Sequence, residues 1–580
     1  MAVAEREHTI GDVVVRRDVP AVMRDGTILR ADVYRPQEPG SYPVLVQRTP
    51  YDKTVAQQIT YSHPAWYARR GYVVVVQDTR GRFASDGDFV PFEDEALDTA
   101  DTVAWAAQLD GSNGRVATYG FSYPGANQLL GAAEQPEGLA CIAPGFTGSD
   151  FYDGWTYVGG AFSLAFVVSW IEPLLALPEA LRRGDLEAAI ALASNATNYP
   201  GLYWTQPLAE FPLLKSTGAA PYFFDWLEHD TRDEYWRSLS IRERYDRIAA
   251  PALHFGGWYD SFIEGTLENY AALSARHGDD PRRAQRLVVG PWLHIPWGPL
   301  NGVRHFGDDA RNRLDELQLE WFDYWLKDRG AEPPGPPVRL FVMGANGWRD
   351  FDGWPPAGVR VQEWHLRSSG KATSSSGDGS LSRERPAAGE PPDVYVSIPA
   401  MPVPSMGGRS CCDAGITPMG PLEQSFVETR NDVLVYSTPV LERDLTVIGT
   451  VELVLYAATD AADTDWTAKL VDVDERGHAV NLCDGIVRAR FRESLEQPTP
   501  IEPNRVYEYR IRVGSTANVF EAGHRLRLEV SSSNFPMFDV NNNTGQRVGE
   551  ATILQGKVAT QAVFHDADRP SRLLVPVLPD

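Results

Sequence analysis

The chain has 580 residues, 43% of them hydrophobic, with 54 Lys and Arg against 78 Asp and Glu, a formal net charge of −24. This length suits about three to four domains with sizeable cores. The charge argues against nucleic acid or an anionic membrane as a partner. Four cysteines are too few for a disulfide scaffold, and no signal peptide is visible, so we expect a cytoplasmic protein.

The first 144 residues alternate strand and helix patterns. Continuous apolar runs at 44–48 and 72–77 predict strands covered on both faces of a sheet. Apolar residues recur with a helical period over 94–107, and 115–119 has the pattern of another buried strand. This order predicts a doubly wound α/β arrangement.

A tight turn at Gly120-Phe-Ser-Tyr-Pro-Gly carries the strongest chemical signal. A serine between a strand and a helix is how α/β-hydrolases present a nucleophile, with the helix N-terminus aimed at the developing negative charge. Here the second glycine, Gly125, comes one residue later than in the usual G-x-S-x-G pattern. The motif alone therefore leaves open an ordinary turn in which Ser122 caps the helix.

The rest of the chain falls into three parts. Residues 145–245 lose the strand signal and are predicted to form a helical insertion, after which strands at 252–255 and 287–290 and a helix at 310–327 resume the sheet. From 338 onward strand patterns dominate and predict a β-sandwich, with a Ser-, Gly- and Pro-rich mobile loop or linker at 367–392. The expected domains are 1–144 with 246–337, 145–245, and 338–580.

A serine nucleophile needs a base and an acid that orients the base. In α/β-hydrolases these follow in the order Ser, Asp or Glu, His, each just after a strand. Asp260 and His294 each follow one of the two later strands, so we predict the triad Ser122, Asp260 and His294. His305 is the main alternative base, whereas His254 lies within a strand and is interpreted as a core histidine.

The oxyanion that forms during acyl transfer needs two hydrogen-bond donors. The N–H of Tyr123, directly after the nucleophile, is the first. The loop Arg48-Thr-Pro-Tyr-Asp-Lys has no Gly-Gly run to present a second backbone amide, but it offers the phenol of Tyr51. The alternative is that Tyr51 is only a surface tyrosine.

These motifs occur in order with further long stretches, among them Gln77-Asp-Thr-Arg-Gly-Arg, Gly256-Gly-Trp-Tyr-Asp-Ser-Phe and Asp463-Thr-Asp-Trp-Thr-Ala-Lys. Together they resemble the cocaine esterase-type (CocE/NonD) serine hydrolases, relatives of the X-Pro dipeptidyl-peptidases and the α-amino-acid ester hydrolases. The resemblance implies an α/β-hydrolase domain with an inserted helical domain and a C-terminal jelly-roll-like β domain. It also implies the triad and the oxyanion donors named above, with no cofactor and no metal.

The resemblance further implies an aromatic acyl pocket, to which Trp155, Trp170 and Phe262 correspond by position. Such walls suit a benzoyl-like or other bulky acyl group, although each residue taken singly is equally well explained as a core aromatic. Cys411 and Cys412 stand where the family has bulky apolar side chains. This departure implies a roomier pocket or a loop that is placed differently.

We therefore expect a serine carboxylesterase that acts on small-molecule esters with bulky acyl groups, aromatic ones included, through an acyl-enzyme on Ser122. One alternative is an α-amino-acid ester hydrolase, an acyltransferase or an X-Pro dipeptidyl-peptidase with the same triad. Binding a substrate ammonium would then require carboxylates such as Asp150 or Asp153. A second alternative is an inactive protein whose β domain binds a ligand such as a glycan. The oligomeric state stays open, with a homodimer through the β domain as one alternative.

Overall fold

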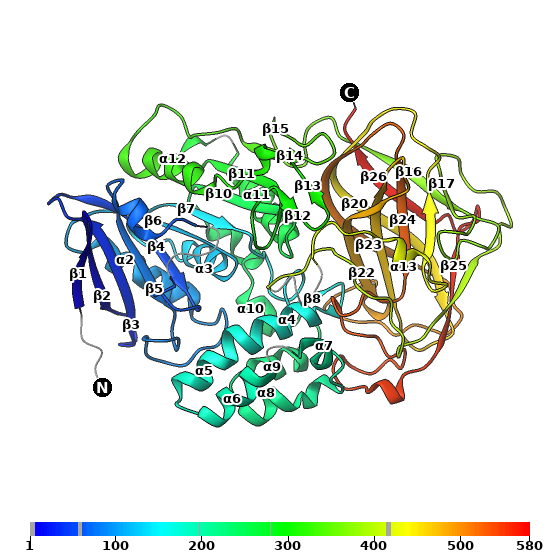
Figure 1. The fold of residues 1–580 in the computed structure, drawn as a ribbon, viewed down its shortest axis with the longest axis horizontal. Coiled ribbons are helices and arrows are strands. Elements are labelled where there is room, and N and C mark those ends of the chain that lie inside the picture. The colour runs from blue at the N-terminus through cyan, green and yellow to red at the C-terminus, as the bar shows by residue number, and fades with distance from the viewer. Residues whose placement is uncertain (1–5, 56–60, 196–197, 279, 413–418, 580) are drawn as a thin grey trace.

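The computed structural model describes residues 6–55, 61–195, 198–278, 280–412 and 419–579. Two large β-sheets lie at opposite ends of an elongated molecule, and a group of helices lies between and beside them (Figure 1). The chain passes from the first sheet into the helices, returns to the first sheet, and then forms the second.

The first sheet is mainly parallel in its centre. Its spatial order is β1 (Arg6–Ile10), β2 (Val13–Val22), β3 (Ile28–Pro36), β5 (Val73–Asp78), β4 (Tyr42–Thr49), β6 (Ser112–Phe121), β7 (Leu139–Gly145), β10 (Ala252–Tyr259), β11 (Gln285–Leu293), β14 (Val338–Val342) and β15 (Gly347–Phe351). The strands from β5 through β14 run parallel, and the three N-terminal strands and β15 pair antiparallel. The predicted α/β class is confirmed.

Helices cover both faces of this sheet, which explains the continuous apolar runs. In β5, Val73 and Val75 belong to a core shared with α2 (Glu95–Ala107), whereas Val74 and Val76 belong to a core shared with α12 (Leu314–Lys327). Alternate residues of one strand thus enter two different cores. The other helices of this part are α1 (Pro64–Ala68), α3 (Tyr123–Ala132) and α11 (Ile263–His277).

The expected boundary at residue 338 does not coincide with the change of sheet. β14 pairs parallel with β11, with Val338 opposite Leu287, and β15 closes this edge as an antiparallel hairpin. Both strands therefore extend the first sheet. A strand pattern predicts a strand but does not show which strand it pairs with. The sequence analysis therefore placed β14 and β15 in the β domain.

Between β7 and β10 the chain is mostly helical. The elements are β8 (Tyr157–Val158), β9 (Ala161–Phe162), α4 (Leu164–Ile171), a π-helical turn (Glu172–Ala176), α5 (Leu177–Arg182), α6 (Leu186–Asn195), α7 (Tyr199–Leu202), α8 (Pro212–Thr217), α9 (Tyr222–Glu228) and α10 (Glu234–Leu239). The helix that begins with the apolar run 164–170 extends well beyond that run, because helical structure continues through Arg182. This 19-residue segment is long and apolar enough to cross a membrane, but 72% of its apolar window is buried inside the protein, as in a core helix.

The second sheet forms the C-terminal part. Its strands are β16 (Arg360–Arg367), β17 (Ser380–Ser382), β18 (Asp393–Ser397), β19 (Leu434–Ser437), β20 (Leu445–Thr459), β21 (Asp465–Val473), β22 (Ala479–Arg488), β23 (Tyr507–Phe520), β24 (Arg525–Ser531), β25 (Ala559–Phe564) and β26 (Arg572–Val577), with the short helix α13 (Ser425–Glu428). The segment 367–392, expected as a mobile loop, contains β17, which pairs with β16.

His254 lies inside β10, as expected for a core histidine. It is 1% exposed, its Nε2 contacts the Gln285 side chain at 3.0 Å, and burial lowers the pKa of His254 to about 4. The unfolded chain therefore takes up a proton on His254 as pH falls below 6.5, whereas the folded chain resists until about pH 4.

We expect this histidine to cost the fold about 3 kcal/mol of stability between pH 6.5 and 4. The thermal midpoint of the wild-type protein should fall relative to that of His254→Gln over this range, since only the wild type carries the titrating group. A difference between the two midpoints that does not change with pH would contradict the expectation.

Candidate active site

Ser122, Asp260 and His294 lie at one edge of the first sheet. Each directly follows a central strand: Ser122 follows β6, Asp260 follows β10, and His294 follows β11. These strands and the intervening β7 are parallel neighbours, so their carboxyl ends meet at the same edge. A crevice at the carboxyl ends of parallel strands is where open α/β sheets place their ligands.

Ser122 occupies a strained turn between β6 and α3. Its φ of 63° and ψ of −127° are unusual for a residue other than glycine, and the side chain sits just below the surface. Two glycines make the turn possible. A Cβ on Gly120 would lie 2.6 Å from Pro124, and one on Gly125 would lie 2.6 Å from the Gly145 carbonyl. Glycine is therefore required at position 125, because α3 approaches β7 closely there.

The His294 imidazole is oriented by Asp260. Nδ1 of His294 lies 2.7 Å from Oδ1 of Asp260, and both side chains are buried. Phe121, the residue before Ser122, packs against the imidazole with ring centroids 5.6 Å apart. A carboxylate at Nδ1 keeps the proton on that nitrogen, so Nε2 is free to accept one.

Tyr51 lies beside the serine on the loop after β4. Its hydroxyl accepts a hydrogen bond of 2.8 Å from Nε1 of Trp170 and also interacts with the Ser122 side chain. Burial raises the pKa of the Tyr51 phenol, so the hydroxyl keeps its proton at neutral pH. Tyr123 is the first residue of α3, where a backbone N–H has no partner within the helix. Both predicted donors thus lie next to Ser122.

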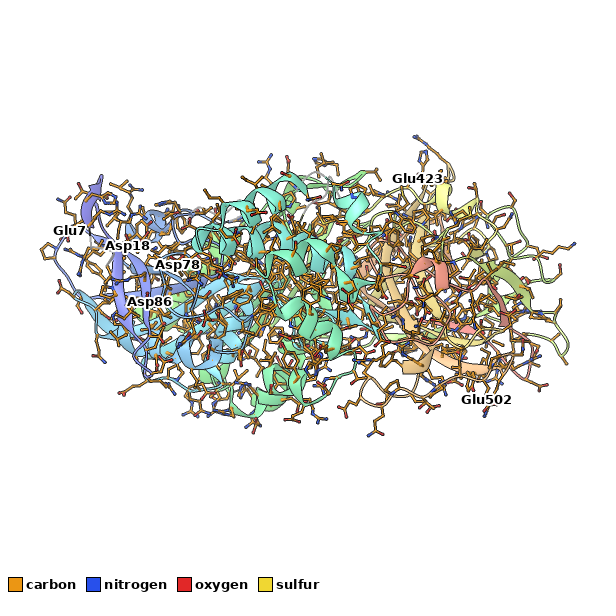
Figure 2. All side chains as sticks on the ribbon, turned by 90° about the horizontal axis from the view of Figure 1, so that it is seen from below. Glu7, Asp18, Asp78, Asp86, Glu423 and Glu502 are labelled. Carbon is orange, nitrogen blue, oxygen red and sulfur yellow. A yellow bond between two sulfur atoms is a disulfide. The ribbon has the colours of Figure 1, made fainter. Side chains whose placement is uncertain are left out.

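Side chains that the sequence analysis did not single out hold the Tyr51 loop in place. Arg82 donates to the Pro50 carbonyl at 3.0 Å and, through its other nitrogens, to two carbonyls of the helical part. Lys53 bonds to Asp78 through both its backbone N–H and its Nζ, at 2.7 and 2.8 Å, and also pairs with Asp18. Asp18 and Asp78 are labelled near the N-terminal end in Figure 2. Lys53, Asp78 and Arg82 belong to the quoted motifs, which could have marked them, whereas Asp18 lies outside these motifs.

We expect Tyr51→Phe to lower kcat by about 10²- to 10³-fold with little change in KM, the usual loss when one oxyanion donor is removed. The matched control is Tyr61→Phe, because the Tyr61 hydroxyl is also buried but has no hydrogen-bond partner among the described residues. Steady-state kinetics on an activated ester would check this. Equal rates for the two variants would mean that the second donor is another group.

Trp155, Trp170 and Phe262 come together in one aromatic cluster. Phe262 stacks on Trp155 at 4.0 Å, Trp155 meets Trp170 edge-on at 5.7 Å, and Phe262 meets the His294 ring at 5.2 Å. All three side chains are almost fully buried. They come from the loop after β7, from α4 and from the turn before α11, so two separate parts of the chain build this wall.

Cys411 and Cys412 are joined to each other in a disulfide. Cys411 is buried in the same apolar cluster as Trp155, Trp170 and Phe262, and Cys412 packs against it. The sequence analysis placed these cysteines near the pocket but did not predict that they pair. The two remaining cysteines, Cys141 and Cys483, are buried free thiols.

The other candidates have structural partners. Asp150 is fully buried, pairs with Arg232 at 2.8 Å and accepts from Ser240, and Asp153 pairs with Arg512 at 3.1 Å. Neither carboxylate is therefore an unpaired receptor for a substrate ammonium. His305 is exposed and accepts a hydrogen bond from the backbone of Gly307.

Two family models match the chain. Residues 25–296 match the X-Pro dipeptidyl-peptidase (S15 family), and residues 333–574 match the X-Pro dipeptidyl-peptidase C-terminal non-catalytic domain. Among solved structures, an α-amino acid ester hydrolase is similar with a TM-score of 0.83 and 26% identity over 98% of this chain and 97% of the other. An aminopeptidase from a marine sediment Thaumarchaeota archaeon is similar with a TM-score of 0.81 and 25% identity over 99% and 96%.

A curated relative is more similar in sequence. The cocaine esterase of Rhodococcus sp. (strain MB1 Bresler) is 38% identical, and the alignment covers 98% of this chain and 99% of the relative. Similarity at this level across both full lengths includes the sheet edge that carries Ser122, Asp260 and His294. The chain therefore belongs to the cocaine esterase-type (CocE/NonD) family and is a serine hydrolase that acts on ester bonds.

Proposed function

We propose that the protein is a carboxylesterase for small-molecule esters with bulky aromatic acyl groups, and that it works through an acyl-enzyme on Ser122. The observation that carries this proposal is the position of Phe262. Its ring lies against the His294 imidazole at 5.2 Å and stacks on Trp155 at 4.0 Å. An aromatic wall beside the base favours a flat apolar acyl group at the reacting carbonyl.

The proposed mechanism is acyl transfer in two steps. His294 takes the Ser122 proton on Nε2 while Asp260 holds Nδ1–H, and the serine oxygen attacks the ester carbonyl. The Tyr51 hydroxyl and the Tyr123 N–H stabilise the oxyanion. The alcohol leaves with the proton from His294, and water then attacks the acyl-enzyme with His294 again acting as the base.

The alternative is a preference for α-amino acyl groups, in line with the α-amino acid ester hydrolase and the aminopeptidase among the similar structures. Against it stand Asp150 and Asp153, the two carboxylates that the sequence analysis named as ammonium ligands, because each is already paired with an arginine. A substrate ammonium would have to compete with Arg232 or Arg512 for its partner. We therefore favour the simple ester.

A matched set of substrates tests the proposal. Acetyl, butyryl, benzoyl and α-aminophenylacetyl esters of one alcohol, with an X-Pro anilide, would be compared by kcat/KM. We expect the benzoyl ester to have the highest kcat/KM of the set. If the α-amino ester or the anilide has the highest kcat/KM, the alternative is favoured. If the acetyl ester has the highest kcat/KM, this contradicts an aromatic acyl pocket.

We also propose how the chain divides into domains and what each domain contributes to the active site. Residues 145–245 would form an inserted helical domain that supplies Trp155 and Trp170. The α/β-hydrolase domain would comprise 1–144 and 246–351, extended by β14 and β15, and the remainder to 580 would form a jelly-roll-like β domain. In this arrangement the active site depends on all three parts, because Cys411 of the β domain is buried in the same apolar cluster as Trp155, Trp170 and Phe262.

A further inference from the structure

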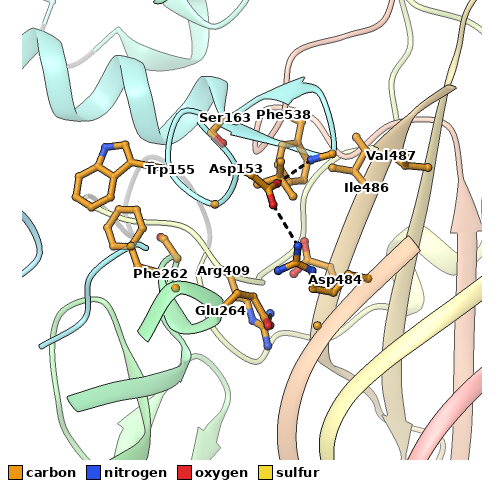
Figure 3. Close-up of a pocket in the computed structure, with 18 of the residues that line it drawn as sticks. Asp153, Trp155, Ser163, Phe262, Glu264, Arg409, Asp484, Ile486, Val487 and Phe538 are labelled. Carbon is orange, nitrogen blue, oxygen red and sulfur yellow. Dashed lines mark hydrogen bonds and ion pairs between the residues drawn. The ribbon is translucent and has the colours of Figure 1, made fainter. Parts of the chain in front are cut away.

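Arg82 is a buried arginine that has no carboxylate partner. It is 1% exposed, and within the described ranges no Asp or Glu forms an ion pair with its guanidinium. Arg409, which lines the cavity shown in Figure 3, pairs with Glu264 at 2.7 Å. Three other described arginines are no more than 7% exposed, and each has a carboxylate partner: Arg48 with Glu95, Arg232 with Asp150 at 2.8 Å, and Arg488 with Asp465 at 2.9 Å.

The guanidinium of Arg82 stays charged in spite of its burial. Burial lowers the pKa of Arg82, but an arginine keeps its proton in proteins. Glu179, whose charge acts on Arg82, already bonds to Arg182 and Arg183 at 2.8 and 2.6 Å. A buried charge without an opposite charge beside it is costly to the fold, which indicates a role for Arg82 other than stability.

The Arg82 guanidinium joins two parts of the chain through three main-chain carbonyls. Nε donates to the Pro50 carbonyl at 3.0 Å, whereas Nη1 and Nη2 donate to the carbonyls of Leu175 and Leu174 at 3.0 and 2.9 Å. The Leu174 carbonyl needs such a donor, because Pro178, four residues later, has no N–H to offer it. Arg82 thus ties the loop after β4 to the π-helical turn of the helical part.

The same helical segment also holds the Tyr51 hydroxyl. Trp170, four residues before Leu174, donates from Nε1 to this hydroxyl at 2.8 Å. The main chain of the loop, through Arg82, and the phenol, through Trp170, are therefore fixed to one segment. Burial raises the pKa of the Tyr51 phenol, and the charge of Arg82 acts on it in the opposite direction. A positive charge near a donor favours donation toward a developing negative charge.

We propose that Arg82 is a positioning residue for the reaction, which holds the Tyr51 hydroxyl where the oxyanion forms. The inference rests on the proposed function, in which Tyr51 is one of the two oxyanion donors. Arg82 forms no hydrogen bond with Ser122, Asp260 or His294, all of which the structure describes. Its effect on the rate therefore passes through Tyr51.

The test is a double-mutant cycle between Arg82→Met and Tyr51→Phe. It measures kcat and KM on whichever ester of the matched set has the highest kcat/KM, so that the result does not depend on the acyl preference. Arg82→Met alone should lower kcat about 10²-fold with little change in KM, the loss typical when a group in the site is displaced by ~1 Å.

In the Tyr51→Phe background, Arg82→Met should lower kcat by less than about twofold, because the hydroxyl that Arg82 positions is already absent. A merely structural role would lower kcat by the same factor in both backgrounds. If thermal unfolding shows that Arg82→Met is not folded, Arg82→Lys takes its place in the cycle. A lysine keeps the charge but lacks the planar fork that bonds several carbonyls.

Arg286→Met is the matched control. Arg286 is a half-buried arginine that donates to the carbonyls of Gly335 and Gln285, both at 3.0 Å, and it has no ion-pair partner in the part of the chain that the structure describes. It lies near the start of β11, whereas His294 follows the end of this strand. Arg286→Met should keep the kcat of the wild type.

The outcomes separate this inference from the proposed function. Equal losses in the two backgrounds, or full kcat in folded Arg82→Met, would overturn the role of Arg82 and leave Tyr51 as an oxyanion donor. Full kcat in Tyr51→Phe would contradict the proposed mechanism itself, and the role of Arg82 would fail with it.

Discussion

Replacing Ser122 by alanine is expected to lower kcat for an activated aryl ester by about 10⁶-fold, the loss typical when the nucleophile of such a triad is removed. Without the hydroxyl, no acyl-enzyme can form, and the remaining oxyanion donors and binding contacts support only weak attack by water. The measurement is kcat and KM with the benzoyl ester, at enzyme concentrations high enough to detect a residual rate.

The control for this variant is Ser169→Ala. Ser169 is another buried serine, on α4, and its hydroxyl donates to the Ala165 and Phe166 carbonyls within the helix. It should keep full activity. Comparable activity in Ser122→Ala and the wild type would rule out Ser122 as the nucleophile, whatever the geometry of the turn.

Replacing Asp260 by asparagine is expected to lower kcat by about 10⁴-fold while the fold remains intact. The side chains are nearly the same size, but an amide facing Nδ1 of His294 at 2.7 Å would donate a hydrogen bond instead of accepting one. The imidazole would then carry its proton on Nε2, where it can no longer accept the proton of Ser122. Kinetics with thermal unfolding of the same sample would separate this effect from instability.

Asp323→Asn serves as the control for Asp260→Asn. Asp323 lies on α12 and pairs with Lys327 at 2.9 Å, so this substitution also removes a paired carboxylate from the α/β part. Its activity should equal that of the wild type. A loss of less than tenfold in Asp260→Asn would mean that another group orients His294.

The sequence was sufficient to bring the three proposed triad residues, Ser122, Asp260 and His294, to one edge of the sheet, because each directly follows a strand with a clear pattern. Buried parallel strands leave continuous apolar runs, and the residue after each run must lie at the carboxyl edge. Gly120 and Gly125 could be recognised as turn residues, although only the structure gives the reason for the spacing, which is the contact of Gly125 with the Gly145 carbonyl.

Features that depend on contacts between distant segments could not be predicted in the same way. The membership of β14 in the first sheet depends on its pairing with β11, and no local pattern records a partner. The bond from Trp170 to the Tyr51 hydroxyl joins residues 119 positions apart. The pairing of Asp153 with Arg512 spans 359 positions, so the sequence alone left Asp153 open as a substrate ligand.

Labelling with an active-site serine phosphonate, followed by peptide mass mapping, tests the central claim most directly. The account predicts one adduct per chain, on the peptide that contains Ser122, and loss of esterase activity in proportion to the fraction labelled. It also predicts that Asp260→Asn labels far more slowly, because its His294 cannot activate the serine. An adduct on another residue, or full activity in fully labelled protein, would contradict the assignment of Ser122 as the nucleophile.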